Sequence, residues 1–233
     1  MPNFPIPLAV FNFLPVALTG VALWFLAHYV RGQAAANDRL ALLGAGLILA
    51  GGLSKALWKL IAAVTGLDLV WLANALFPLM APGFALLCAA IWGATRRQRG
   101  LRPPAGLWPA TLATIAVAFA VAAYRQWVLE SPRGWFLPLL VLASLGNLGL
   151  SLLLIGASLR LRRWSVAALF AVNLGMIFAL QPIAMATPKT LALHWLEQSL
   201  TAFGTGCFAL AAYLLSRTAA VGGLRHHGEA RGR

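Results

Sequence analysis

The segment LALLGAGLILAGGLSKALWKLIAAV, from Leu40 to Val64, decides the fold. It is apolar over more than the roughly 20 residues that a helix needs to cross the hydrocarbon core of a bilayer. Lys55 and Lys59 are its only charged residues. A segment inside the membrane must satisfy its backbone hydrogen bonds internally, as a helix does. The segment therefore predicts a transmembrane helix.

Six further segments have the same length and character. They are separated by short links that carry glycine, proline or charged residues, so the chain has no room for a second domain. We predict one seven-helix transmembrane domain over residues 1–217 and a basic, disordered cytoplasmic tail over residues 218–233. The expected fold class is an all-α integral membrane protein, with spans at 6–29, 40–64, 69–93, 107–129, 135–159, 165–186 and 191–215.

The composition excludes a water-soluble globule. Of the 233 residues, 61% are hydrophobic and 10% charged, whereas ordinary soluble domains are about half apolar and about a quarter charged. The 18 Lys and Arg against 5 Asp and Glu give a net charge of +13, which in a soluble protein would indicate nucleic acid. Here most of the basic residues lie in the links and the tail, so we expect no nucleic acid partner. Cys88 and Cys207 lie inside apolar runs, which favours neither a disulfide framework nor a cysteine metal site.

The basic residues also predict the orientation, because Lys and Arg near span ends are retained on the cytoplasmic side. One set of links holds Arg125, Arg133 and Lys189. The other links and the tail hold Arg31, Arg39, Arg96, Arg97, Arg99, Arg102, Arg160, Arg162, Arg163, Arg217, Arg225, Arg231 and Arg233. We therefore expect the N-terminus outside and the C-terminus in the cytoplasm of a bacterial inner membrane. The arginines of the tail are expected to contact anionic lipid.

The chain also resembles itself when it is shifted by 124 positions. The shift aligns Trp71 with Trp195, and the tripeptide FAL at Phe84 with FAL at Phe208. This indicates a parallel 3+1+3 repeat, in which spans one to three recur as spans five to seven and span four is a linker. Such repeats are related by an axis along the membrane normal. The alternative is a chance similarity of leucine-rich helices.

Polar groups inside spans are the best functional signal, because burying them in hydrocarbon is costly. In the last span, His194, Glu197, Gln198, Thr201 and Thr205 recur at spacings of three and four residues and share one helix face. That face is expected to point into the bundle or into a wet cavity.

We expect Glu197 to pair with Lys55, Lys59 or Arg125 beneath the outer surface, because an unpaired carboxylate in hydrocarbon protonates or finds a cation. Lys59 and Arg125 lie close enough to the interface to extend their charged ends toward water. Lys55 lies too deep for that.

The candidate ligand-binding or ion-pair residues lie mainly toward the outer ends of the spans. They are Glu197, His194, Lys55, Lys59, Asn74, Gln181, Gln198 and Arg125, and Asn147 and Asn173 lie near mid-membrane. Asn74 and Gln198 are interpreted either as ligand groups or as groups that hydrogen-bond between helices. The chain contains no HExxH, CxxC, GxSxG or Walker motif, so no catalytic residue, metal ligand or cofactor is assigned. His28 and His194 belong to opposite leaflets, which argues against a haem held by both.

Three functions remain open from the sequence. The first is transport or binding of a small solute through an outward-facing polar pocket between the second, third, sixth and seventh helices. The nearly apolar inner halves of the spans argue against a charged solute that crosses the whole membrane. The second is a membrane sensor, or a structural subunit of a homo-oligomer or a larger membrane complex. The third is a membrane enzyme on a lipid or quinone, with His194 and Glu197 as acid and base.

Overall fold

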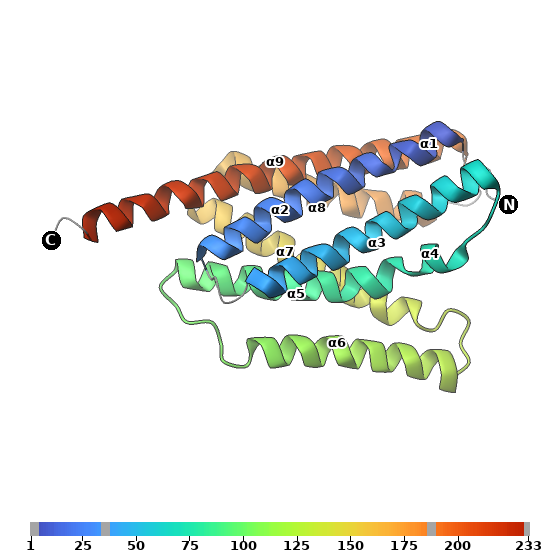
Figure 1. Cartoon of the computed structure of the whole chain (residues 1–233), viewed down its shortest axis with the longest axis horizontal. Coiled ribbons are helices and arrows are strands. Elements are labelled where there is room, and N and C mark those ends of the chain that lie inside the picture. The colour runs from blue at the N-terminus through green and yellow to red at the C-terminus, as the bar shows by residue number, and fades with distance from the viewer. Residues whose placement is uncertain (1–4, 34–37, 186–189, 231–233) are drawn as a thin grey trace.

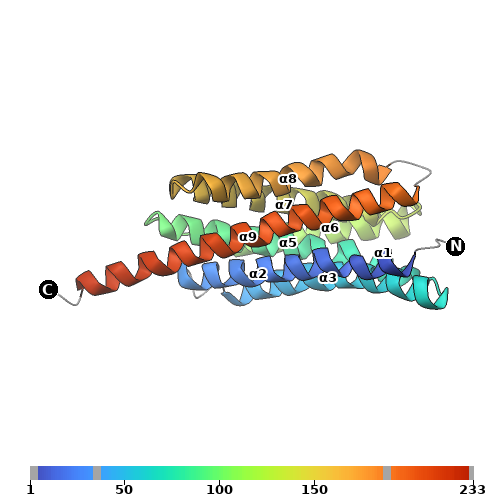
Figure 2. The same ribbon diagram turned by 90° about the horizontal axis from the view of Figure 1, so that it is seen from above.

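The computed structural model describes residues 5–33, 38–185 and 190–230, and the side chains of residues 5–33, 38–180 and 190–217. The chain is 87% helical, and the described residues form no strand. The long helices run side by side along the long axis of the molecule (Figure 1, Figure 2). They are α1 (Ile6–Phe11), α2 (Phe13–Gln33), α3 (Asp38–Thr65), α4 (Val70–Asn74), α5 (Leu76–Gln98), α6 (Leu107–Ala123), the π-helical turn η2 (Tyr124–Val128), α7 (Phe136–Arg160), α8 (Trp164–Met185) and α9 (Leu191–Ala230).

The lengths of these helices fit a bilayer. Six helical segments of 22 to 29 residues are long and apolar enough to cross a membrane, and α8 contributes the apolar stretch Trp164–Leu180. This confirms a helical integral membrane protein whose environment is the lipid bilayer. α9 continues as a helix to Ala230, into the segment that was expected to form the tail. The division into a bundle and a disordered tail stays a prediction.

Two spans are broken near one end, and in each the short first helix ends four residues before a proline. A proline inside a helix lacks a backbone N–H, and its ring clashes with the carbonyl four residues earlier. α1 ends at Phe11, four residues before Pro15, and α4 ends at Asn74, four residues before Pro78. Asn12 lies at the break in the first span. The Nδ2 atom of its side chain donates a hydrogen bond to the Leu8 carbonyl at 2.7 Å.

Glycines bring α3 and α5 into close contact. A Cβ atom added at Gly83 would lie 2.8 Å from the Gly44 carbonyl oxygen, and one added at Gly51 would lie 2.9 Å from the Leu76 carbonyl oxygen. Small residues at a helix interface let two backbones approach in this way, which is a common device in membranes.

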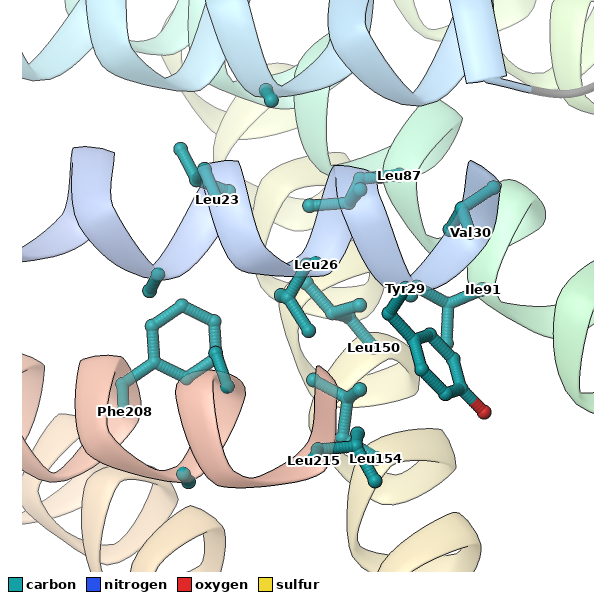
Figure 3. Packing of buried hydrophobic residues seen from close by; sticks show 14 of the residues in the cluster. Leu23, Leu26, Tyr29, Val30, Leu87, Ile91, Leu150, Leu154, Phe208 and Leu215 are labelled. Carbon is teal, nitrogen blue, oxygen red and sulfur yellow. The ribbon is translucent and has the colours of Figure 1, made fainter. Parts of the chain in front are cut away.

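The main hydrophobic core occupies only one half of the bundle. It includes Leu23, Leu26, Tyr29 and Val30 of α2, Leu87 and Ile91 of α5, Leu150 and Leu154 of α7, and Phe208 and Leu215 of α9 (Figure 3). These residues lie between the middle of the bundle and the end at which α2 finishes. We call this the packed half. The Tyr29 hydroxyl donates a hydrogen bond to Gln98 Oε1 at 3.0 Å and ties α2 to the end of α5 there.

α6 packs along the outside of the bundle and contacts mainly α7 and α5 (Figure 1). Its apolar side chains are largely exposed, for example Leu112, Val117 and Val121. η2 ends this span, and the link after it folds back closely, because a Cβ atom at Gly134 would lie 2.7 Å from the Arg125 carbonyl oxygen.

Candidate functional site

Two adjoining cavities lie in the other half of the bundle, which contains α1 and which we call the hollow half. A smaller buried cluster packs beside them and consists of Ala81, Ala122, Leu139, Leu142 and Ala143. The larger has a volume of about 770 Å³ and lies between α3, α4, α5, α7 and α8. The smaller has a volume of about 310 Å³ and lies between α2, α3, α5, α7, α8 and α9. Met80, Phe84, Asn147 and Ile177 line both. The two cavities therefore adjoin at these four side chains.

The larger cavity carries two cations. Lys55 of α3 and Arg133, in the link before α7, both line it, together with the Asn74 side chain at the break between α4 and α5. The carbon of the Arg133 guanidinium group lies 5.1 Å from the centre of the Phe136 ring and 6.0 Å from that of Trp135. A cation at such a distance over an aromatic ring is attracted to it. This cavity has both charge and an apolar, aromatic wall.

Aromatic packing fixes the position of this wall. The rings of Phe77 in α5 and Phe136 in α7 meet edge to face with 5.1 Å between their centres, a preferred arrangement for aromatic pairs. Leu145 and Phe178 also line the larger cavity, and they are 63% and 58% exposed. The cavity thus reaches the lipid-facing surface on the side of α7 and α8.

The smaller cavity is lined without any charged side chain. Its polar groups are the amides of Asn147 and Asn173 and the hydroxyls of Thr19, Thr201 and Thr205. Thr201 Oγ1 donates a hydrogen bond to the Glu197 carbonyl at 2.7 Å, and Thr205 Oγ1 donates one to the Thr201 carbonyl at 2.9 Å. These hydroxyls use their protons within α9 and present acceptor oxygens to the cavity, whereas the two amides can donate as well.

Lys59 lies outside both cavities, in a separate cluster beside the break in the first span. Its Nζ atom donates a hydrogen bond to Asn12 Oδ1 at 2.9 Å, and the residue is only 8% exposed. The expectation that Lys59 extends to the interface is wrong. The amide of Asn12 faces it from the break between α1 and α2 and provides a polar partner inside the protein, so the lysine need not reach water.

The first turns of α9 approach the same cluster. The Trp195 ring packs against Phe11, which precedes Asn12, with 5.6 Å between ring centres. Gln198 is 8% exposed, and His194 and Glu197 are half-buried. His194, Glu197 and Gln198 line neither cavity, whereas Thr201 and Thr205, from the same predicted face, line the smaller one. An inward-facing position is therefore confirmed for the two threonines.

Arg125 lies in η2, at the end of the peripheral helix α6, and lines neither cavity. Its Nε atom is buried without a hydrogen-bond partner among the described residues. The side chain of Gln181 lies outside the described residues. Within the part of the chain that the structure describes, no three His, Cys, Asp or Glu side chains gather as they would around a metal ion.

Of the predicted site residues, Lys55 and Asn74 both line the larger cavity, whereas Lys59, His194, Glu197, Gln198 and Arg125 line neither cavity. Arg133, Trp135 and Phe136 were not among the predicted site residues, because the sequence presents Arg133 only as a charge in a link. The run RGWF at 133–136 is a usable signal, since it places an arginine directly beside two aromatic residues at a span end.

Comparison with protein-family models, curated proteins and solved structures finds no match for this chain. The functional argument therefore rests on the residues themselves.

Proposed function

We propose that this chain binds a small solute in the two adjoining cavities and admits it from the outer side of the membrane. The observation that carries the proposal is the contrast between the two halves. The larger cavity lies in the hollow half, the smaller one extends from it to Leu23 and Phe208 at the edge of the hydrophobic core, and that core fills the other half. Ligand sites in helical bundles are commonly such concave, mostly apolar spaces with a few polar groups.

The charge distribution supports the proposed orientation. Arg125 and Arg133 lie at the end of the hollow half. The described arginines at the end of the packed half are more numerous, namely Arg31, Arg39, Arg96, Arg97, Arg99, Arg102, Arg160, Arg162, Arg163 and Arg217. By the preference of basic residues for the cytoplasm, the packed half faces inward in a bacterial inner membrane. The cavities then open to the outside.

Transport is the form of this function that the suggested repeat favours. Phe84 and Phe208, which the shift of the chain aligns, both line the smaller cavity. Transporters built from repeats bind their substrate near mid-membrane, between the repeats. The structure would then correspond to an outward-open state, and solute release inward requires the packed half to open. The acid-base enzyme receives less support, because His194 and Glu197 line neither cavity.

Cysteine accessibility tests this proposal. Cys88 and Cys207 are replaced by alanine in the full chain, and Ser144→Cys or Thr201→Cys then puts a single thiol in the larger or the smaller cavity. The matched control is Ser151→Cys, because Ser151 lies on the same helix as Ser144 but is 2% exposed in the packed half. A small membrane-impermeant thiosulfonate is applied to right-side-out and to inside-out membrane vesicles.

We expect the thiols at positions 144 and 201 to react in right-side-out vesicles and to stay unmodified in inside-out vesicles. The thiol at position 151 should stay unmodified in both. Reaction only in inside-out vesicles would refute the orientation, and no reaction at either cavity position would refute an open pocket.

A further inference from the structure

We propose that the ligand of the larger cavity is an amphipathic anion, with its acidic group at Lys55 and Arg133 and its apolar body along the aromatic wall. This inference rests on the proposed function and names the ligand class that the same site would accept.

The charge of the cavity selects for an anion. Lys55 and Arg133 line the larger cavity, and no acidic residue does so among the described side chains. Two of those acidic groups are engaged elsewhere. The Asp38 carboxylate lies 3.2 Å from Arg31 Nε, and Asp68 accepts a hydrogen bond from Trp58 Nε1 at 2.7 Å. Glu130 and Glu197 line neither cavity. Two cations in a space with low-dielectric walls focus a positive potential there.

The rest of the wall selects for an apolar body. Beyond the two cations, the larger cavity is lined mostly by aliphatic and aromatic side chains, among them Phe77, Phe136, Leu140 and Phe178. A small inorganic anion could pair with the two cations but would leave this apolar wall without a partner. An amphiphile places its acidic group at the cations and buries its body against the rings.

The position of the cavity fits entry from the bilayer. Leu145 and Phe178 belong both to the cavity wall and to the exposed surface of α7 and α8. An amphiphile in the outer leaflet could therefore enter sideways, with its apolar body in the lipid-facing opening. Because its acidic group would remain in the hollow half, this binding needs no charge in the apolar packed half.

Two sources share this chemistry, a free single-chain acid and an anionic phospholipid of the bilayer. Both present an anionic group on an apolar body. We therefore test them in separate arms of one experiment, with dodecyl phosphate as the single-chain probe and phosphatidylglycerol as the bilayer lipid.

The full chain with its single thiol at position 144 is reconstituted in phosphatidylcholine vesicles, and its reaction with an uncharged, impermeant maleimide is timed. Dodecyl phosphate, dodecyltrimethylammonium or dodecyl maltoside is then added. We expect dodecyl phosphate to slow the reaction about tenfold, because two cations contribute to its binding. The cationic and the uncharged amphiphile should leave the rate within about twofold, since they have the same chain without the acidic group.

The double variant Lys55→Met with Arg133→Gln should lose this protection. Arg163→Gln, which removes an exposed arginine at the opposite end, and Lys55→Arg, which keeps the charge, should retain it. Without added amphiphile, an unchanged rate at position 144 reports that the double variant still has its pocket. If that variant does not fold, the comparison of the three amphiphiles on the unsubstituted pocket decides alone.

In the second arm, vesicles that contain phosphatidylglycerol replace pure phosphatidylcholine. Protection without added amphiphile identifies a bilayer lipid as the ligand, and protection by dodecyl phosphate alone identifies a free acid. Equal protection by all three amphiphiles, protection that persists in a folded double variant, or none from either anion would overturn the inference. In those cases labelling at position 144 still takes place and the proposed pocket stands, whereas an unreactive thiol would mean that the pocket itself is absent.

Discussion

At the scale of single residues, the hydrogen bond between Lys59 and Asn12 is the contact with the clearest energetic consequence. The Nζ atom of Lys59 lies 2.9 Å from Asn12 Oδ1, and both residues are 8% exposed. Removing one partner of a buried, charge-assisted hydrogen bond leaves the charge poorly solvated. The pair also joins α3 to the break between α1 and α2, so its loss acts on two elements.

Asn12→Leu should therefore lower the free energy of unfolding by about 1.5–3 kcal/mol, measured by equilibrium unfolding in mixed micelles. Asn74→Leu is the matched control, because Asn74 is half-buried on the wall of a cavity, and it should cost clearly less. In a Lys59→Met background the cost of Asn12→Leu should fall to that of losing the Nδ2 hydrogen bond to the Leu8 carbonyl, about 0.5–1.5 kcal/mol. An equal cost in both backgrounds would show that the hydrogen bond is not what Asn12 contributes.

The sequence could place lysines and amides on a span but could not choose their partners. Lys55 and Lys59 lie one turn apart on α3, yet Lys55 lines a cavity and Lys59 is buried against Asn12. That choice depends on a residue 47 positions away and on how α1 bends. The sequence could not identify Arg133 as a site residue either, because its role depends on the fold of the link that brings it over Phe136.

At the scale of elements, hydropathy predicts where the helices lie, because each span must be apolar over the thickness of the bilayer. The same signal does not report breaks within a span. Prolines do so only in part, since Pro15 and Pro78 each follow a break, whereas Pro82 lies inside α5. At Pro82 the chain continues as a helix although the Pro78 carbonyl has no backbone N–H four residues later to bond it.

The glycine contact between α3 and α5 gives a test at this scale. Gly83→Ala would place a Cβ atom 2.8 Å from the Gly44 carbonyl oxygen and 2.8 Å from Ile48 Cγ1, so the two helices must separate. We expect a loss of about 1–3 kcal/mol in the free energy of unfolding. Gly46→Ala is the control on α3, because a Cβ atom there would meet nothing within 4 Å. It should leave stability unchanged or raise it by up to about 1 kcal/mol, since alanine favours the helix. Similar losses in both variants would contradict a specific close approach.

At the scale of the whole molecule, the division into a packed and a hollow half is a property that composition does not report. Leu148 and Leu154 lie on the same helix and are the same residue type, yet Leu148 lines the larger cavity and Leu154 is fully buried in the core. Only the packing of α7 against its neighbours separates them. The polar side chains gave a partial signal, because most of the predicted candidates lie in the half that proved hollow.

The division into two halves predicts that the same leucine-to-alanine substitution lowers the free energy of unfolding by different amounts in each half. Leu154→Ala would open a new void in a close-packed region and lose dispersion contacts that no lipid can replace, at a cost of about 2–5 kcal/mol. Leu148→Ala would only enlarge a space that already reaches the surface, so lipid or solvent can fill it, and we expect a loss below about 1 kcal/mol. Both variants keep the helix propensity of α7 matched, because the same substitution is made within one helix.

The comparison is made by equilibrium unfolding in mixed micelles and repeated with dodecyl phosphate present. The amphiphile should stabilise the Leu154→Ala protein, whose pocket is intact, by as much as it stabilises the unsubstituted chain. Equal losses in the two variants would mean that protein packs as closely around Leu148 as around Leu154. The contrast between the two halves, on which the proposed function depends, would then disappear.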